Sequence, residues 1–363
     1  MIVFGVLFWF AGLVLFGRIR SCETEGTLEE KLTCSVIIPA RNEVNRIGYL
    51  LESLKRQSVP PNEIIVADDD SNDGTAEIAL NSGARVIRVM HKPSDWTGKT
   101  WACMTAAQKA EGKLLLFLDA DTRLEPDGLR RILLTYRRYG GMVSVLPYHR
   151  MKHFWERLSA IFNAAIPAGV RAFSIPKPRK GPSGAFGPCI ICSTTDYFNC
   201  GGHASVRRHV LENLALGKVF RQSGMRVTCR MGDSVLWFRM YSVGPREMIE
   251  GWTKGFASGA GMLDLSGLLL VVAWISGAFT TVSGLIYSII IGSRKSFISI
   301  FWLYSLYVLQ FRAILRRLGN YGLLAPLLFP ILVSFFTIVF IRSVISRNLT
   351  RSVSWRGRKM QPG

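Results

Sequence analysis

Acidic residues are scarce in this sequence: 25 Asp and Glu stand against 45 Lys and Arg, and the net charge is +20. So basic a chain can bind nucleic acid, but it carries no sequence signature of a nucleic-acid-binding fold. Much of the positive charge flanks apolar segments, at Arg312, Arg316 and Arg317 and from Arg342 to Lys359. Charge in such positions typically faces anionic lipid, so we expect a membrane partner and no nucleic-acid partner.

The number of cysteines in the sequence is odd. There are seven, and nothing indicates an oxidising compartment, so a disulfide framework is not expected. The spacing of Cys189, Cys192, Cys200 and His203 is compatible with a zinc site. The alternative is a buried strand over 185–193 whose small residues happen to be cysteine, followed by a Gly-Gly turn. We favour the strand.

Long apolar runs occur at two places, residues 2–17 and about 264–341. The first run is uncharged and is followed by Arg18 and Arg20. A signal peptide usually has its positive charge before the apolar run, so we predict an uncleaved anchor over residues 1–20. The charges after it place the next domain in the cytoplasm.

The second apolar region, 264–341, contains two segments long enough to span a bilayer, Gly267–Gly292 and Leu323–Ile341. A third segment, Phe297–Phe311, is shorter. Three crossings would place the basic tail, 342–363, outside the cell, against the positive-inside rule. We therefore expect two crossings and a cytoplasmic tail, with Phe297–Phe311 interfacial or re-entrant.

Between these regions the pattern alternates strand and helix. Strands are predicted at 34–40, 63–67, 85–89 and 114–118, and helices at 44–57, 75–81 and 99–110. This order is typical of an α/β fold with a mainly parallel, Rossmann-like sheet, which binds ligands at the carboxyl ends of its strands. Three polar clusters fall at those ends: Ala40–Glu43, Asp68–Asp70 and Asp119–Asp121.

The pattern is less regular after residue 125. Residues 151–172 mix apolar and basic side chains and predict a helix lying on the membrane surface. Residues 175–188 are rich in proline, glycine and basic residues and predict a mobile loop. Residues 203–223 predict a helix that ends at Gly224, and a strand follows over 225–230.

Asp119 and Asp121 are separated by one residue and follow an apolar strand directly. Two carboxylates so placed can hold Mg²⁺ or Mn²⁺, which take oxygen ligands and bridge phosphates. Such an ion would neutralise the charge on a departing diphosphate. In the second cluster, Asp69 can accept a hydrogen bond from a pyrimidine base, while Asp73 can cap the helix that follows.

These clusters resemble the nucleotide-sugar half of glycosyltransferase family 2: Pro39–Glu43, Asp68–Thr75 and Asp119–Asp121 match its motifs in order and spacing. The resemblance covers about residues 33–255. Within the family, Trp96–Lys99, Gly201–His203 and Gly251–Lys254 are similar to the membrane-anchored carotenoid-pathway members.

The resemblance implies a GT-A fold over 33–255, a UDP-sugar donor and a divalent metal, Mg²⁺ or Mn²⁺. It implies that Asp121 is the principal metal ligand, assisted by Asp119, and that Asp69 binds the uracil. The nucleotide would be lined by Pro39, Arg41 and Glu43, and Lys99 would approach the diphosphate or the sugar.

The position of the catalytic base departs from the family, which usually has Glu-Asp where this chain has Glu212-Asn213. An amide takes no proton at neutral pH. Either Glu212 is the base, or none is needed because the acceptor is a carboxylic acid, which is already ionised at pH 7. A third interpretation makes Glu212 a solvated helix residue.

Three further residues are candidates for acceptor binding. Trp252 can stack on the acceptor and Lys254 can contact phosphate, or Trp252 can anchor the chain at the membrane surface. His203 can contact donor or acceptor, or form only a local hydrogen bond.

The expected function is inverting transfer of a sugar, glucose, from a UDP-sugar to a membrane lipid acceptor, a carotenoid carboxylic acid, at the cell membrane. The metal would stabilise the leaving diphosphate while the acceptor attacks from the opposite face. Two alternatives stay open: a polyprenyl-phosphate glycosyltransferase, and a non-catalytic membrane scaffold with a decayed transferase domain, which only Asn213 favours.

Overall fold

The computed structural model of the protein describes residues 2–28, 32–179, 181–242, 244–259, 264–350, 353–355 and 358–360. The chain forms two compact units. The sheet unit combines residues 20–149 and 180–239, and the helical unit combines residues 1–19, 150–179 and 240–361. Residues 150–179 and 240–255, which the sequence analysis grouped with the transferase domain, therefore belong to the helical unit.

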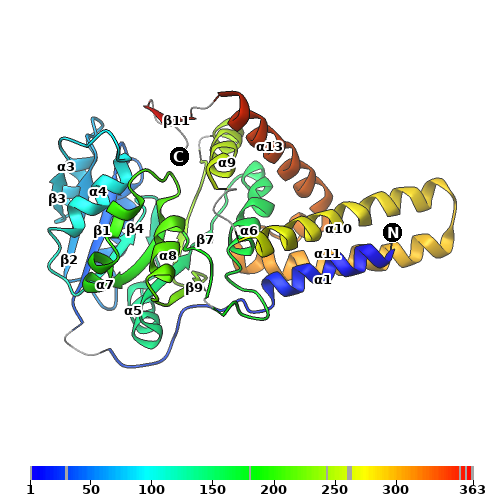
Figure 1. The fold of residues 1–363 in the computed structure, drawn as a ribbon, viewed down its shortest axis with the longest axis horizontal. Helices are drawn as coiled ribbons and strands as arrows, with labels where there is room; N and C mark the ends of the chain where they lie inside the picture. Colours follow the sequence, from blue (N-terminus) through cyan, green and yellow to red (C-terminus); the bar gives the residue numbers. More distant parts are fainter. Residues whose placement is uncertain are drawn as a thin grey trace. The chain divides into compact units, whose positions relative to one another are not determined.

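The sheet unit is built on a seven-stranded sheet with the strand order β3–β2–β1–β4–β8–β6–β9 (Figure 1). All its strands run parallel except β8, which is antiparallel to β4 and β6. The strands are β1 (Cys34–Ala40), β2 (Glu63–Asp68), β3 (Arg85–Arg88), β4 (Leu114–Leu118), β6 (Met142–Leu146), β8 (Cys189–Ser193) and β9 (Val227–Met231).

The register of the central strands brings the polar clusters together. Strand β1 pairs with β2 so that Ala40 lies opposite Asp68, and with β4 so that Ile37 lies opposite Phe117. The carboxyl ends of β1, β2 and β4 therefore meet at one edge of the sheet, where parallel sheets bind their ligands. This confirms the mainly parallel sheet that the sequence predicts.

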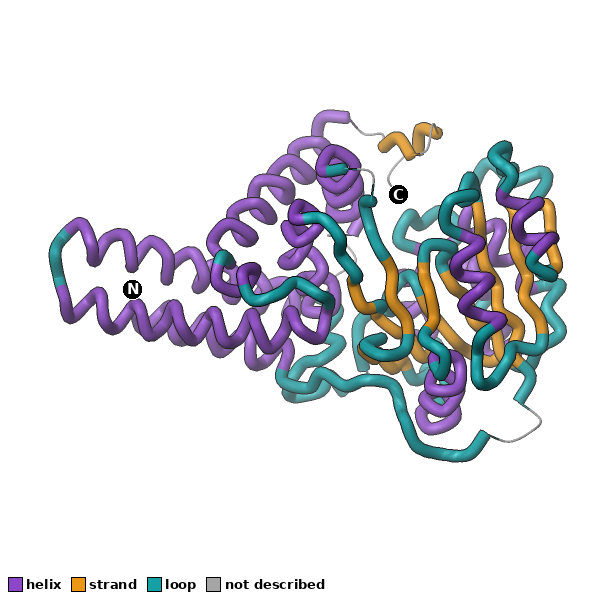
Figure 2. The backbone as a smooth tube through the Cα atoms, turned by 180° about the vertical axis from the view of Figure 1, so that it is seen from behind, coloured by secondary structure: helices purple, strands orange, loops and turns teal. Residues whose placement is uncertain are grey.

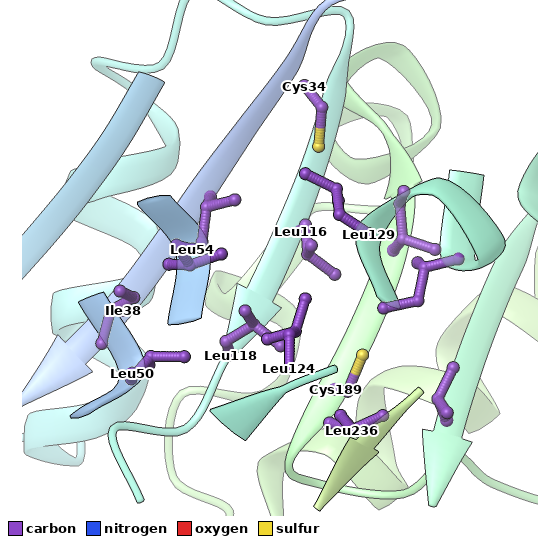
Figure 3. Close-up of a cluster of buried hydrophobic side chains, with 14 of the residues drawn as sticks. Cys34, Ile38, Leu50, Leu54, Leu116, Leu118, Leu124, Leu129, Cys189 and Leu236 are labelled. Carbon is purple, nitrogen blue, oxygen red and sulfur yellow. The ribbon is translucent and has the colours of Figure 1, made fainter. Parts of the chain in front are cut away.

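One face of the sheet packs against α2 (Ile47–Lys55) and α5 (Gly128–Tyr139). Figure 3 shows Leu50 and Leu54 of α2 beside Leu116 and Leu118 of β4, in a cluster that also contains Leu129. A smaller sheet borders this core, with the order β5 (Thr122–Leu124), β10 (Leu236–Phe238) and β7 (Tyr148–His149).

The other face of the sheet packs against α7 (Thr194–Asn199) and the 3₁₀ helix η2 (Gly202–Val206). Phe117, whose side chain points away from the leucine cluster, contacts the rings of Tyr197 and His203. The remaining elements of this unit are α3 (Thr75–Asn81), α4 (Gly98–Ala107) and α8 (Glu212–Gln222).

The helical unit contains a long hairpin of α10 (Leu265–Ile290) and α11 (Arg294–Leu318), with α1 (Ile2–Phe16) packed along it (Figure 1). Figure 2 shows the same hairpin from behind. The other elements are η1 (Phe154–Ser159), α6 (Ala160–Gly169), α9 (Pro245–Gly259), α12 (Leu324–Leu327), α13 (Phe329–Thr350) and the strand pair β11 (Val353–Trp355) and β12 (Arg358–Met360).

Close packing in the hairpin depends on small residues and one buried amide. A side chain at Gly12 would lie 2.5 Å from Gln310, and one at Gly277 would lie 2.1 Å from Tyr307. The Gln310 amide accepts a hydrogen bond from the Trp274 indole and donates one to the main chain of Trp9, so it links α1, α10 and α11. Small residues and polar links of this kind are typical of helix packing in membranes.

Three helices of the described chain are long and apolar enough to cross a membrane: α10, α11 and the first 18 residues of α13. Helix α1, with 15 residues, is shorter. The prediction that Phe297–Phe311 is a short interfacial or re-entrant segment is wrong, because these residues lie inside the continuous 25-residue helix α11.

Two further predictions differ from the structure. Residues 203–223 do not form one helix: η2 ends at Val206 and α8 begins at Glu212. Residues 151–172 were expected to form a helix on the membrane surface, but α6 is buried along almost its whole length within the helical unit. The loop predicted over 175–188 contains no helix or strand in its described residues.

Candidate active site

The turn after β4 carries Asp119 and Asp121. The Asp119 amide donates to the carbonyl of Pro188 over 3.0 Å, and the Thr122 amide and hydroxyl donate to the carbonyl of Asp119 over 3.0 and 2.7 Å. Ala120 is buried between the two aspartates. The backbone is thus fixed in a tight turn that presents both carboxylates at the edge of the sheet.

The electrostatics of this turn favour a cation. Burial, together with the negative charges of Asp119 and Glu43, raises the pKa of Asp121 to about 7. Repulsion between neighbouring carboxylates is relieved by a bound metal ion as well as by a proton. The described residues contain no set of three His, Cys, Asp or Glu side chains that could hold a metal alone. Asp121 and Asp119 therefore fit an ion whose other ligands are oxygens of a bound diphosphate.

The loops after β1 and β2 hold each other in place. Asp73 accepts hydrogen bonds from the amides of Val44 and Thr75, both over 3.1 Å, and from the Thr75 hydroxyl. Although burial alone would raise it, these hydrogen bonds lower the pKa of Asp73. The Thr75 hydroxyl in turn accepts from the Glu43 amide over 2.8 Å. Asp73 thus has a structural role, but it does not cap α3, whose N-cap is Gly74 with no side-chain cap.

The residues predicted to bind the nucleotide lie at this edge. Arg41 donates to the carbonyl of Asp69 over 2.6 Å, and its guanidinium lies 3.7 Å from the Asp69 carboxylate and 3.9 Å from Asp70. Pro39, partly buried in β1, lies opposite Ala67 of β2. Glu43 lies 3.3 Å from Arg46, a residue that the sequence analysis did not single out.

The first turn of α4 closes the site beside Asp69. A Cβ atom at Gly98 would lie 2.0 Å from the Asp69 carboxylate, so only glycine allows this approach. Thr97 caps the helix by accepting from the amide of Thr100. The glycine of the Trp96–Lys99 motif is therefore required by the contact with Asp69.

Lys99 projects from the same turn and joins two carboxylates. Its ammonium lies 2.7 Å from Asp119 and 2.8 Å from Glu212. The Lys99 side chain is 27% exposed, whereas the Glu212 side chain is 6% exposed. The sequence analysis predicted that Lys99 approaches the donor, and it did not foresee the link to Glu212.

The pair Glu212-Asn213 opens α8, and both side chains are buried. The Asn213 amide nitrogen donates to the carbonyl of Gly187 over 2.7 Å and to Glu212 over 2.9 Å. Glu212 is therefore no solvated helix residue. A carboxylate at position 213 would face two acceptor oxygens in this arrangement, whereas the amide can donate to both.

The two loops beside Lys99 are tied to each other. The carbonyl of Arg207 accepts from the Thr97 amide and from the Thr100 hydroxyl, both over 2.9 Å, and the Arg207 guanidinium lies 2.6 Å from Asp95. The partnership of Asp95 with Arg207 spans 112 residues of sequence, and no local pattern indicates it.

The predicted acceptor residues occupy different environments. His203 is fully buried, and its Nδ1 lies 2.8 Å from the Tyr197 hydroxyl. Burial and the nearby Lys99 charge lower the pKa of His203 to about 3, so the ring is neutral. The local hydrogen bond that the sequence analysis left open is thus present, and a direct contact with substrate would need His203 to become exposed.

Trp252 belongs to α9 in the helical unit. It is 4% exposed, its indole stacks on Phe162 at 4.8 Å, and its N–H donates to Ser159 over 3.0 Å. The structure thus gives Trp252 a packing role in place of acceptor stacking or a surface anchor. Lys254 lies in the same helix, but its side chain is outside the described part of the chain.

The cysteines form no zinc site within the described residues. Cys189 and Cys192 lie in β8 and are buried, as the strand interpretation predicts, and Cys200 donates to the carbonyl of Tyr197.

The sequence was compared with protein-family models and with known proteins. Residues 35–214 match the model of glycosyl transferase family 2. The chain is 39% identical to the 4,4'-diaponeurosporenoate glycosyltransferase of Staphylococcus haemolyticus, over 96% of this chain and 92% of that protein. It is 35% identical to the protein of the same name from Staphylococcus aureus strain N315, over 96% of this chain and 93% of that one.

Among solved structures, the fold is similar to that of the mannosyltransferase PcManGT from Pyrobaculum calidifontis, which was solved with GDP-Man and Mn²⁺. The TM-score is 0.56 at 14% identity, and 95% of each chain is covered. This likeness, with the mainly parallel sheet, confirms the GT-A fold. The family match and the two relatives show that the chain is a glycosyltransferase and belongs to glycosyltransferase family 2.

Proposed function

We propose that this glycosyltransferase transfers glucose from UDP-glucose to the carboxylate of a carotenoid acid, with inversion at the anomeric carbon. The observation that carries the proposal is the environment of Glu212, whose carboxylate is bonded to Lys99 and Asn213 where a free base would be needed for a hydroxyl acceptor. The name of the relatives supports it, because diaponeurosporenoate is a carboxylate.

The donor would lie along the edge formed by the ends of β1, β2 and β4. In this proposal Asp69 accepts from the uracil ring, and Pro39, Arg41 and Glu43 line the nucleotide. Asp121 and Asp119 would hold Mg²⁺ or Mn²⁺, which supplies charge neutralisation at the diphosphate. The raised pKa of Asp121 supports this role, since it reflects a site short of positive charge.

The acceptor chemistry follows from the absence of a second carboxylate at position 213. A hydroxyl must lose its proton as it attacks, and a positioned base accelerates that step greatly. A carboxylate has already lost its proton at neutral pH and only needs to be aligned with the anomeric carbon. Transfer to it forms a glycosyl ester and releases UDP.

The membrane helices suit an acceptor that resides in a bilayer. We propose that the chain is a multi-pass protein of the cell membrane, with residues 1–20 as an anchor and the sheet unit in the cytoplasm. The exposed apolar side chains of α10 and α11, among them Ile290, Trp302 and Leu309, support this placement because they would contact lipid.

The test is transfer from radiolabelled UDP-glucose into the organic extract of membranes that contain the chain and a supplied carotenoid acid. We expect label in the lipid fraction with Mn²⁺, none after chelation, and none for Asp121→Ala. Label in polyprenyl phosphate instead would show that the acceptor is a polyprenyl phosphate and not a carotenoid acid, while the chain would still be a glycosyltransferase. Failure of the purified chain to bind UDP with Mn²⁺ would contradict the proposal altogether.

A further inference from the structure

We propose that Lys99 is a positioning residue that holds the Glu212 carboxylate at the edge of the metal site and balances the charge of the acidic cluster. The inference rests on the proposed function and adds a role for a side chain that the sequence assigned to the donor. Lys99 contacts Asp119, in the turn after β4, and Glu212, at the start of α8, and so links two separate elements.

The geometry leaves Lys99 little freedom. Its helix turn is fixed on one side by the contact of Gly98 with Asp69 and on the other by the carbonyl of Arg207, which binds Thr97 and Thr100. Lys99 therefore emerges from a backbone that two neighbouring loops hold in place. Because the backbone is already fixed, only the rotatable bonds of the side chain remain to be ordered when Lys99 binds its partners.

The charge balance makes the lysine necessary for Glu212. The Glu212 side chain is 6% exposed, and a carboxylate that deep is costly without a cationic partner. Both interactions of Glu212, from Lys99 and from Asn213, reach the same oxygen, Oε1. Within the described residues no hydrogen bond reaches Oε2, so that oxygen can accept a hydrogen bond from a hydroxyl of the donor sugar, a role that needs no proton transfer.

The same ammonium opposes a metal ion. Lys99 touches Asp119 directly, so removing its charge should strengthen binding of a cation at Asp119 and Asp121. A lysine that only contacted the diphosphate of the donor would instead weaken nucleotide binding when it is lost. The two roles therefore predict different effects on metal affinity measured without nucleotide.

The experiment measures Mn²⁺ affinity by electron paramagnetic resonance, and turnover, for the full chain in detergent. For Lys99→Met we expect Mn²⁺ binding about tenfold tighter and kcat about 100-fold lower. Lys99→Arg should return Mn²⁺ affinity to the wild-type value. In a Glu212→Gln background, Lys99→Met should lower kcat by no more than about threefold, because the two residues act together.

Unchanged or weaker Mn²⁺ binding in Lys99→Met would overturn the proposal, as would an equal loss of kcat in both backgrounds. Because Mn²⁺ affinity is read without any acceptor, this result stands apart from the identity of the acceptor. A wild-type chain that binds Mn²⁺ but glycosylates no carotenoid acid would contradict the proposed function. The comparison of Mn²⁺ affinity between wild type and Lys99→Met would still test the role of Lys99.

We infer, from a separate set of contacts, that α12 and α13 form a re-entrant element. This element enters the membrane and returns to the same side. The starting point is the end of α11. Asn320 exchanges hydrogen bonds of 2.7 and 3.0 Å with the main chain of Met151, two residues after His149 of β7. This end of the hairpin thus lies beside the start of the segment 150–179 of the helical unit.

The chain then runs back along α11. Phe329, the first residue of α13, stacks on Phe311 at 5.2 Å, and the Tyr304 hydroxyl donates to the carbonyl of Leu327 over 2.5 Å. At 1.5 Å per residue, Phe311 and Tyr304 lie roughly 10 and 20 Å along α11 from its end at Leu318. Helix α13 therefore begins at a depth well inside the hairpin.

From there α13 returns. Phe336 contacts Phe162 of α6 at 4.9 Å, and further along Ser343 donates to the carbonyl of Thr253 in α9 over 2.7 Å. Helix α9 begins at Pro245, six residues after Arg239 of the sheet unit. Figure 1 shows α13 leaving the hairpin rather than following it to its tip. Both ends of the element thus lie toward the same end of the hairpin, the end at which Asn320 contacts Met151.

This topology leaves α10 and α11 as the crossings. It predicts that Arg342 and the basic residues that follow it in the sequence face the side to which α13 returns, as the positive-inside rule favours. The test uses sealed vesicles and a membrane-impermeant maleimide on a Cys200→Ser background, because the other native cysteines are buried. Three single-cysteine variants are made. One replaces Ser293 at the hairpin tip, one replaces Lys218 of α8, and one adds a cysteine after Gly363.

We expect the cysteines at Lys218 and after Gly363 to react from the same side and the one at Ser293 from the opposite side. Reaction of the C-terminal cysteine together with Ser293→Cys would show that α13 crosses and would overturn the inference. Reaction of all three from one side would show that the hairpin does not cross, which would overturn it as well.

Discussion

Gly98 shows how a single missing Cβ shapes the site. The atom that any other residue would add lies 2.0 Å from the Asp69 carboxylate, well inside van der Waals contact. The carboxylate is also held near Arg41, so it cannot move away without losing that contact. Gly98 therefore helps to position two residues: Asp69, which it contacts, and Lys99, which follows it in the sequence.

Substitution Gly98→Ala should displace Asp69 or the first turn of α4, and we expect UDP binding to weaken at least about tenfold. The matched control is Gly48→Ala in α2, where the added atom would lie 3.6 Å from Ile78, an ordinary contact, and helix propensity would improve. Isothermal titration with UDP and Mn²⁺ measures both. Equal affinities for the two variants would refute the role of this contact.

The raised pKa of Asp121 predicts how metal binding depends on pH. Below about pH 7 the Asp121 carboxyl holds a proton that a metal must displace, whereas above that pH the carboxylate is free. Mn²⁺ affinity should therefore fall up to about tenfold per unit of pH below 7 and level off above it. A titration of Mn²⁺ binding from about pH 5.5 to 8 tests this. Affinity that stays constant over that range would contradict it.

Individual residues differed in how far sequence could predict them. Asp119 and Asp121 were located because they follow an apolar strand directly. The link from Lys99 to Glu212 was not foreseen, since it joins positions 113 residues apart that only the folded sheet brings together. Trp252 was predicted to stack on the acceptor or to anchor the chain at the membrane surface. Its contact with Phe162 of α6 could not be foreseen, because the two residues are distant in sequence.

At the scale of elements, the alternation of strand and helix located β1 to β4 to within a residue or two. The antiparallel strand β8 shows only as an apolar run, so its direction could not be predicted from pattern. Helix α11 was underestimated because Arg294 and Lys295 at its start and three arginines near its end shorten the apolar run within a 25-residue helix.

The packing of α9 gives a prediction at this scale. Trp252→Ala would open a cavity against Phe162 and leave Ser159 without its donor, at a cost of about 3–5 kcal/mol. We expect a lower midpoint of thermal unfolding in detergent and an unchanged KM for the acceptor. The control is Trp302→Ala, which alters an exposed side chain of α11. A raised acceptor KM at normal stability would instead show that Trp252 binds substrate.

At the scale of the whole molecule, the chain combines a mainly parallel sheet with a bundle of apolar helices. The sequence indicates the sheet through the alternation of strands and helices, and the bundle through its long apolar runs. Their limits were harder to predict, because residues 150–179 leave the sheet unit and pack in the helical unit before the chain returns. Such an excursion depends on contacts distant in sequence, including the hydrogen bond of Asn163 with Tyr321.

If the acceptor oxygen is already ionised before transfer, a competition between two acceptors will show it. Purified chain would receive labelled UDP-glucose, Mn²⁺ and equal amounts of a carotenoid acid and the corresponding alcohol. The account predicts label only in an alkali-labile product of the acid, as expected of an ester. Label in an alkali-stable product of the alcohol, with the acid untouched, would contradict it.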